Sequence, residues 1–322
     1  MRKKTIIWLS VATLLVVLGG AIFTGTLVAI DFDFQRLSTV KLERATHEIT
    51  EPFHNISVIT NTADVVLVPS KGITTRVECV EEENLRHTVS LKDGTLIVEV
   101  QDTRKWYEHI GIGLFGDASV TIYLPAAEYA TLTLRTSTGD VRIQEDLSLG
   151  SIDVQTDTGD VMCNASPTSS LKVNADTGDI EIASLTTGTI DLSVDTGDIE
   201  ICDVNALGAV AIDVGSGDTE IKNLTCSALV TTGDTGDFFM NGVTVGGLLS
   251  IRRDTGDVQF YGCDAAEAVI QTTTGDVEGS FVTDKTFVVK SSTGDKRVPQ
   301  GTTGGRCEIT TSTGDIEIEI RK

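Results

Sequence analysis

The chain has 322 residues, enough for a sizeable core, and its acidic side chains outnumber the basic ones to give a formal net charge of −22. A surface of that sign repels nucleic acid and anionic lipid, so nucleic acid is excluded as an expected partner. Aromatic residues make up only 5% of the sequence, as expected where narrow layers of branched aliphatic side chains are stacked.

The N-terminal 30 residues are predicted to hold the protein in a cell membrane. Residues 1–4 include three basic side chains, and residues 5–30 contain no charge. About 20 apolar residues span a bilayer, and a basic flank stays in the cytoplasm. The stretch is too long for a cleavable signal peptide and lacks an Ala-x-Ala site. We expect a cytoplasmic tail at residues 1–4 and an uncleaved, single-pass transmembrane signal anchor at residues 5–30, with the bulk of the chain outside.

The next hundred residues are less regular. Residues 31–50 are polar and indicate a juxtamembrane segment with a helical turn or two. Residues 51–130 contain short alternating runs that predict an irregular N-terminal β region capping the rest. Thr62-Ala63-Asp64-Val65 resembles an eroded copy of the corner described next, so irregular coils are expected from about residue 52. A segment with three aromatic residues is expected to cover the coil end, with partner binding as the alternative: Trp106, Tyr107 and Phe115.

Residues 131–322 repeat one short phrase ten times. Nine copies read Thr-Gly-Asp and one reads Ser-Gly-Asp, at steps of 19 or 20 residues. A fixed period of about 20 to 50 residues is typical of repeat architectures. The glycines of the ten copies are Gly139, Gly159, Gly178, Gly197, Gly217, Gly236, Gly256, Gly275, Gly294 and Gly314.

Apolar residues alternate with polar ones on both sides of each glycine. This period of two indicates a strand, a Thr-Gly-Asp corner and a second strand in every repeat. A meander of antiparallel hairpins would need Asn-Gly or Asp-Gly turns and about twenty strands in one open sheet. A β-solenoid, in which each repeat is one coil stacked on the next, explains the recurring residue types better. We therefore predict an all-β fold with about ten coils of 19–20 residues.

The corner chemistry has two interpretations. Each glycine is expected at positive φ, and each aspartate is expected to accept backbone N–H groups of its own turn. Alternatively, the stacked carboxylates of Asp-Thr-Gly-Asp corners could bind Ca²⁺, although five copies lack the first aspartate. No other cofactor is expected. The candidate calcium ligands are Asp157, Asp160, Asp176, Asp179, Asp195, Asp198, Asp234, Asp237, Asp254 and Asp257.

No catalytic constellation is visible in the sequence. The acidic residues recur regularly, which indicates corners rather than an active site, and all four histidines precede the repeats. The six cysteines lack metal-ligand spacing and are expected to be mostly free thiols. Departures from the repeat mark the places where a site could lie, namely Gly215-Ser216, Gly233-Asp234 and Lys296-Arg297.

Several phrases outside the repeat, in this order, resemble the bacterial DUF4097 family, as do the Thr-Gly-Asp-Val copies. That family is described as predicted adhesins and is common in Firmicutes. The resemblance implies a membrane-anchored β-solenoid outside the cell and assigns no catalytic residue. The phrases are Asp31-Phe32-Asp33-Phe34, Phe53-His54-Asn55-Ile56, Thr62-Ala63-Asp64-Val65, Asp93-Gly94-Thr95-Leu96, Lys105-Trp106-Tyr107 and Tyr123-Leu124-Pro125.

The functional expectation is a non-enzymatic, adhesin-like or structural module at the cell surface, with a cell-wall polymer or a protein as partner. The alternative is an envelope-stress or regulatory protein that binds an extracellular peptide or wall polymer and works with a membrane partner. The carbohydrate-active enzymes built on β-helices are disfavoured, because they need a paired acid and base in a cleft.

Overall fold

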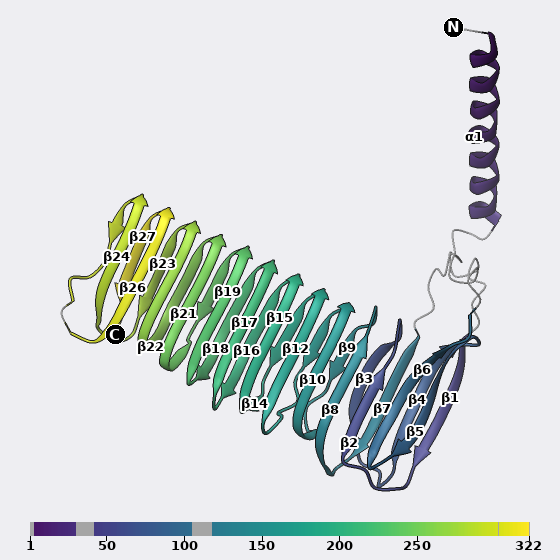
Figure 1. Ribbon diagram of the computed structural model, residues 1–322, viewed down its shortest axis with the longest axis horizontal. Helices are drawn as coiled ribbons and strands as arrows, with labels where there is room; N and C mark the ends of the chain where they lie inside the picture. Colours follow the sequence, from purple (N-terminus) through teal and green to yellow (C-terminus); the bar gives the residue numbers. More distant parts are fainter. Residues whose placement is uncertain (1–2, 30–41, 105–117, 302, 322) are drawn as a thin grey trace.

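The computed structural model describes residues 3–29, 42–104, 118–301 and 303–321. Within these residues one helix, α1 (Lys3–Ala29), precedes a long β-solenoid of about nine turns, close to the ten coils expected from the repeat (Figure 1). The solenoid interpretation is confirmed over the meander, because strands from successive repeats pair in parallel.

The predicted transmembrane anchor is not confirmed. Residues 5–30 do lie largely within α1, but within the described residues no helix is both long enough and apolar enough for a membrane span. Hydroxyl residues interrupt the apolar sequence, and Thr13, Thr24 and Thr26 each donate to the carbonyl four residues earlier.

Each coil contributes one strand to each of two parallel sheet faces that meet at the Thr-Gly-Asp corner (Figure 1). The first face consists of β8 (Glu128–Thr136), β10 (Ser148–Thr158), β12 (Ser170–Thr177), β15 (Thr189–Thr196), β17 (Ala209–Ser216), β19 (Ala228–Thr235) and β21 (Thr244–Thr255). The second consists of β9 (Val141–Ile143), β11 (Val161–Cys163), β13 (Ile180–Ala183), β16 (Ile199–Ala206), β18 (Thr219–Cys226) and β20 (Phe238–Asn241). The short β14 (Thr186–Thr187) extends this face, and β22 (Val258–Thr274) belongs to both.

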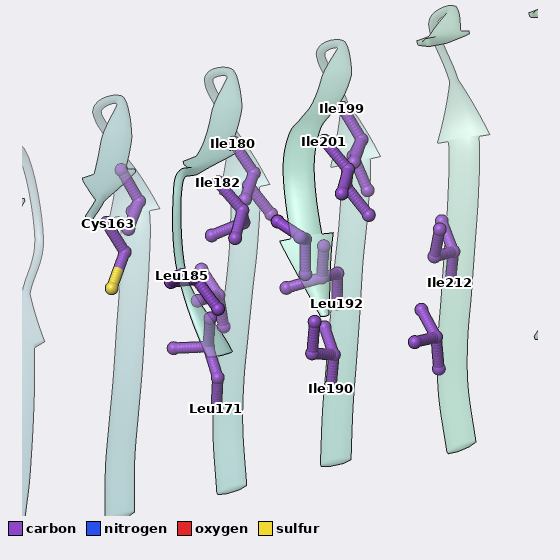
Figure 2. Close-up of a cluster of buried hydrophobic side chains, with 14 of the residues drawn as sticks. Cys163, Leu171, Ile180, Ile182, Leu185, Ile190, Leu192, Ile199, Ile201 and Ile212 are labelled. Carbon is purple, nitrogen blue, oxygen red and sulfur yellow. The ribbon is translucent and has the colours of Figure 1, made fainter. Parts of the chain in front are cut away.

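The core runs along the solenoid between the two faces. Inward positions alternate with outward ones along every strand, so residues of the same register stack on one another, as Ile180 does on Ile199. Figure 2 shows such aliphatic side chains repeating from coil to coil. Leu192 and Ile201 have no exposed surface. Burying each such side chain contributes about 1.5–3 kcal/mol, which makes the aliphatic ladder the main source of stability.

The first coil of the solenoid lies inside the N-terminal end rather than at its tip. Strands β2 (Asn55–Ile59) and β3 (Asp64–Ser70) pair on one side with β8 and β9. On the other side they pair with β6 (Thr95–Asp102) and β7 (Ser119–Pro125). Thr62-Ala63-Asp64-Val65 is therefore a true corner, as its sequence indicated.

Antiparallel strands close this N-terminal end. β4 (Thr75–Glu82) pairs with β7, and β5 (Leu85–Lys92) pairs with β6. The outermost strand is β1 (Leu42–Ile49), which pairs with β4. The prediction of a partly helical juxtamembrane segment is wrong for these residues, because their alternating side chains continue the sheet.

The C-terminal end repeats the same arrangement. Strands β26 (Gly305–Thr313) and β27 (Ile316–Ile320) pair with β22 and β23 (Val277–Phe281) on one side. On the other side they pair with β24 (Lys285–Thr293) and β25 (Lys296–Arg297). The last coil in sequence is thus the penultimate coil in space, and the 285–297 coil forms the tip. This position explains the exposed Lys296 at a nominally inward register.

Candidate functional site: the aspartate ladder, the outer sheet face and a buried polar cluster

The glycine at each corner is required by its backbone. Nine of the ten repeat glycines have φ between +129° and +150°, a region that disfavours side chains; the exception is Gly139. A Cβ built on Gly197 would lie 2.1 Å from the carbonyl oxygen of Gly178 in the preceding coil. The expectation of positive φ is confirmed for the nine.

The corner aspartates form one continuous ladder of hydrogen bonds, and the bonds run between coils rather than within a turn. The N–H of Asp198 donates to Oδ1 of Asp179 at 2.8 Å, and the N–H of Asp218 donates to Oδ1 of Asp198 at 2.7 Å. The prediction that each aspartate accepts a hydrogen bond from its own turn was wrong, because parallel stacking brings the backbone of the next coil within about 4.8 Å. The ladder runs through Asp64, Asp140, Asp160, Asp179, Asp198, Asp218, Asp237, Asp257, Asp276, Asp315 and Asp295.

This geometry gives the calcium hypothesis no support. One oxygen of every ladder carboxylate except that of the terminal Asp295 already accepts a hydrogen bond from a backbone N–H group. The aspartates that precede the corners, such as Asp157 and Asp176, are exposed. Across the described ranges, no three of the ten candidate ligands lie within metal-binding distance of one another.

The second sheet face carries an outward-facing aromatic pair. Phe239 on β20 and Tyr261 on β22 are both half-buried, and their ring centroids lie 6.0 Å apart. The Tyr261 hydroxyl donates to Oε1 of Glu278 at 3.0 Å. Asn241 and Gln259 lie beside the rings in register. The aromatic binding candidates predicted from the sequence, Trp106, Tyr107 and Phe115, lie outside the described residues.

The Gly233-Asp234 departure has a structural explanation. Arg253 on β21 points into the core at the register where most coils carry a small side chain, and it is 1% exposed. A Cβ on Gly233 would lie 1.5 Å from Nη1 of Arg253, so the absence of a side chain at Gly233 leaves space for the guanidinium group. Arg253 Nη2 donates to Oγ1 of Thr219 at 2.7 Å. Burial lowers the pKa of Arg253 to about 10. Gly233 and Arg253 therefore accommodate one another.

The structure brings together a cluster that the sequence analysis missed. Cys79 and Glu81 point inward from β4, and His87 points inward from β5. His87 Nδ1 lies 3.1 Å from Glu81 Oε2, and Thr60 Oγ1 lies 2.9 Å from His87 Nε2. Burial, assisted by Glu81, raises the pKa of the Cys79 thiol to about 12. Burial lowers the pKa of His87, against the opposing hydrogen bond from Glu81.

The signal for this cluster was weak in the sequence. Cys79 and Glu81 are two residues apart on an alternating strand, which puts them on one side, but nothing indicated that β5 lies across the core from β4. All six cysteines are free, and four besides Cys79 are also buried: Cys163, Cys226, Cys263 and Cys307.

Comparison with known proteins identifies the family. A family model described as Toastrack DUF4097 matches residues 53–209 and 204–322. No curated protein matches the chain.

Among solved structures, a candidate adhesin from Bacteroides fragilis is 16% identical, with a TM-score of 0.41 and coverage of 86% of this chain and 97% of that one. A candidate lipid-binding protein from Parabacteroides distasonis is 14% identical, with a TM-score of 0.33 and coverage of 86% and 97%. A candidate cell adhesion protein from Clostridium sporogenes is 9% identical, with a TM-score of 0.23 and coverage of 87% and 100%. At these scores the likeness carries no functional argument. The family match spans well over half of the sequence, and the chain belongs to the DUF4097 (Toastrack) family.

Proposed function

We propose that this chain is a non-enzymatic, adhesin-like module that binds a carbohydrate polymer of the cell surface on the flat face formed by β18, β20, β22 and β23. The observation that carries the proposal is the half-exposed pair of Phe239 and Tyr261 on that face.

The residues around the pair suit a sugar better than a peptide or a lipid. Aromatic rings offer flat apolar surfaces to the C–H faces of sugar rings, and polar tips to hydroxyl groups. The amides of Asn241 and Gln259 and the carboxylate of Glu278 add both donors and acceptors beside the rings. A surface of net negative charge does not attract an anionic lipid.

The solenoid holds this face in place before any ligand arrives. Phe239 and Tyr261 project outward from neighbouring strands. The residues that precede them in sequence, Phe238 and Phe260, point into the core and have no exposed surface. Binding on a preorganised surface loses little conformational entropy, which favours a repetitive polymer that meets the same face along several coils.

The test is binding to insoluble cell-wall polysaccharide by co-sedimentation of the full chain. Replacing both rings, Phe239→Ala with Tyr261→Ala, is expected to weaken binding about tenfold or more, since each ring contributes on the order of 1 kcal/mol. The matched control is Met162→Ala, which removes an exposed apolar side chain from the same face several coils away. Equal binding by the double variant and the unaltered chain would refute the proposed surface.

A further inference from the structure

A buried group of metal-ligating side chains lies at the N-terminal end of the solenoid, far from the aromatic pair. Cys79 and Glu81 come from β4 on one sheet face, and His87 comes from β5 on the opposite face. Their side chains meet in the core. Cys79 has no exposed surface, and Glu81 and His87 are each 5% exposed.

The distances are close to those of a tetrahedral metal site. One ligand atom from each of the three residues lies within 4.8 Å of the other two. Zn²⁺ bonds of about 2.0–2.3 Å place the ligand atoms of a tetrahedral site roughly 3.3–3.8 Å apart. Glu81 Oε2 and His87 Nδ1, at 3.1 Å, are already near that spacing. Since no two of these ligand atoms are more than 4.8 Å apart, closing the thiol toward the other two needs a shift of at most about 1 Å.

A second residue orients the histidine for this role. His87 Nε2 lies 2.9 Å from Thr60 Oγ1, so the ring can carry its proton on Nε2 and leave the Nδ1 lone pair facing the cluster. Metal-bound histidines commonly donate their other N–H group in this way. The backbone N–H of His87 donates to Glu81 Oε2 at 2.6 Å and fixes the carboxylate from the same side.

The charge of the cluster also favours a cation. The Glu81 side chain lies in the protein interior, and among the described residues the only basic side chain within ion-pairing distance of it is His87. An isolated buried charge is costly, and buried carboxylates are therefore paired with cations or coordinate metals. No other group of three potential ligands at this spacing occurs in the described part of the chain.

The geometry points to a structural zinc site formed by Cys79 Sγ, a Glu81 carboxylate oxygen and His87 Nδ1. A fourth ligand, either a water molecule or the second Glu81 oxygen, completes the coordination. Zn²⁺ replaces the thiol proton of Cys79, which leaves as H⁺, and the imidazole proton stays on Nε2 toward Thr60. Because the ligands come from β4 and β5, the metal cross-links the two sheet faces at the N-terminal end.

The experiment uses the full chain in detergent, stripped of metal under reducing conditions and then given Zn²⁺ or Co²⁺. We expect one zinc per chain by mass spectrometry and a thiolate-to-cobalt charge-transfer absorption with Co²⁺. At a hundredfold excess of Zn²⁺ over its dissociation constant, the unfolding midpoint is expected to rise by about 5–10 °C.

Two variants assign the ligands. Cys79→Ala and His87→Gln should each abolish stoichiometric zinc and the cobalt absorption, whereas Cys226→Ala, at a buried cysteine outside the cluster, should retain both. Absence of bound zinc in the unaltered chain overturns the site, and so does a cobalt absorption that survives Cys79→Ala. If Cys79→Ala does not fold, the spectrum of the unaltered chain and of His87→Gln decides the question.

Discussion

Gly197→Ala is expected to lower the free energy of unfolding by at least about 3 kcal/mol, which corresponds to a fall in the unfolding midpoint of roughly 10 °C. Gly197 has φ of +148°, and a Cβ there lies 2.1 Å from the Gly178 carbonyl oxygen and 3.2 Å from Asp179 Oδ1. The backbone of one coil must therefore move away from the next, which also breaks the adjoining ladder hydrogen bonds. Chemical denaturation measures the effect.

Gly262→Ala is the control that separates backbone strain from collision. Gly262 also has positive φ, +61°, but no atom lies within 4 Å of a Cβ built there. An alanine in this left-handed region costs about 1 kcal/mol. Equal losses at Gly197 and Gly262 would show that close stacking of the corners is not what requires glycine.

Deletion of residues 305–322 is expected to unfold two coils rather than one. The deletion removes β26 and β27, whose Ile309, Ile316 and Ile318 are buried at about 1.5–3 kcal/mol each. It also leaves β24 and β25 without the only strands that pair with them in the described part of the chain. Limited proteolysis with mass spectrometry should trim the truncated chain to about residue 281.

A chain ending at Ile320 is the matched control, since it retains every strand and should resist proteolysis as the full chain does. The arrangement would be contradicted if the 285–297 coil stayed protected after the deletion. In that case β24 would have paired directly with β22. The coil of β26 and β27, which lies between them in the full chain, would then contribute little to the stability of this end.

Much of this fold could be predicted from the sequence, because the same repeat of 19 or 20 residues determines the corners, the strands and the core. The invariant Gly-Asp pair places each corner, and the alternation around it places the two strands and the aliphatic core. The residues that deviate, such as Gly233 and Arg253, became interpretable only together, because they lie in neighbouring coils at one inward register.

The order of the coils at the two ends could not be predicted. Local patterns show that residues 305–320 form a coil, but they do not show which coil it pairs with, since every repeat presents a similar edge. The same limit hid the cluster of Cys79, Glu81 and His87, whose members belong to strands on opposite faces. The aromatic pair was missed because Phe239 and Tyr261 are 22 residues apart and become neighbours only through the stacking of coils.

We expect the aspartate ladder to serve the stacking of the coils rather than to bind calcium. The most direct test is thermal unfolding of the metal-stripped full chain by circular dichroism, first without metal and then with Ca²⁺ added. Because every ladder carboxylate except that of the terminal Asp295 already accepts a backbone N–H group, the midpoint should stay within a few degrees. A saturable rise of more than about 10 °C in Ca²⁺ would mean that the carboxylates bind the ion and would contradict the claim.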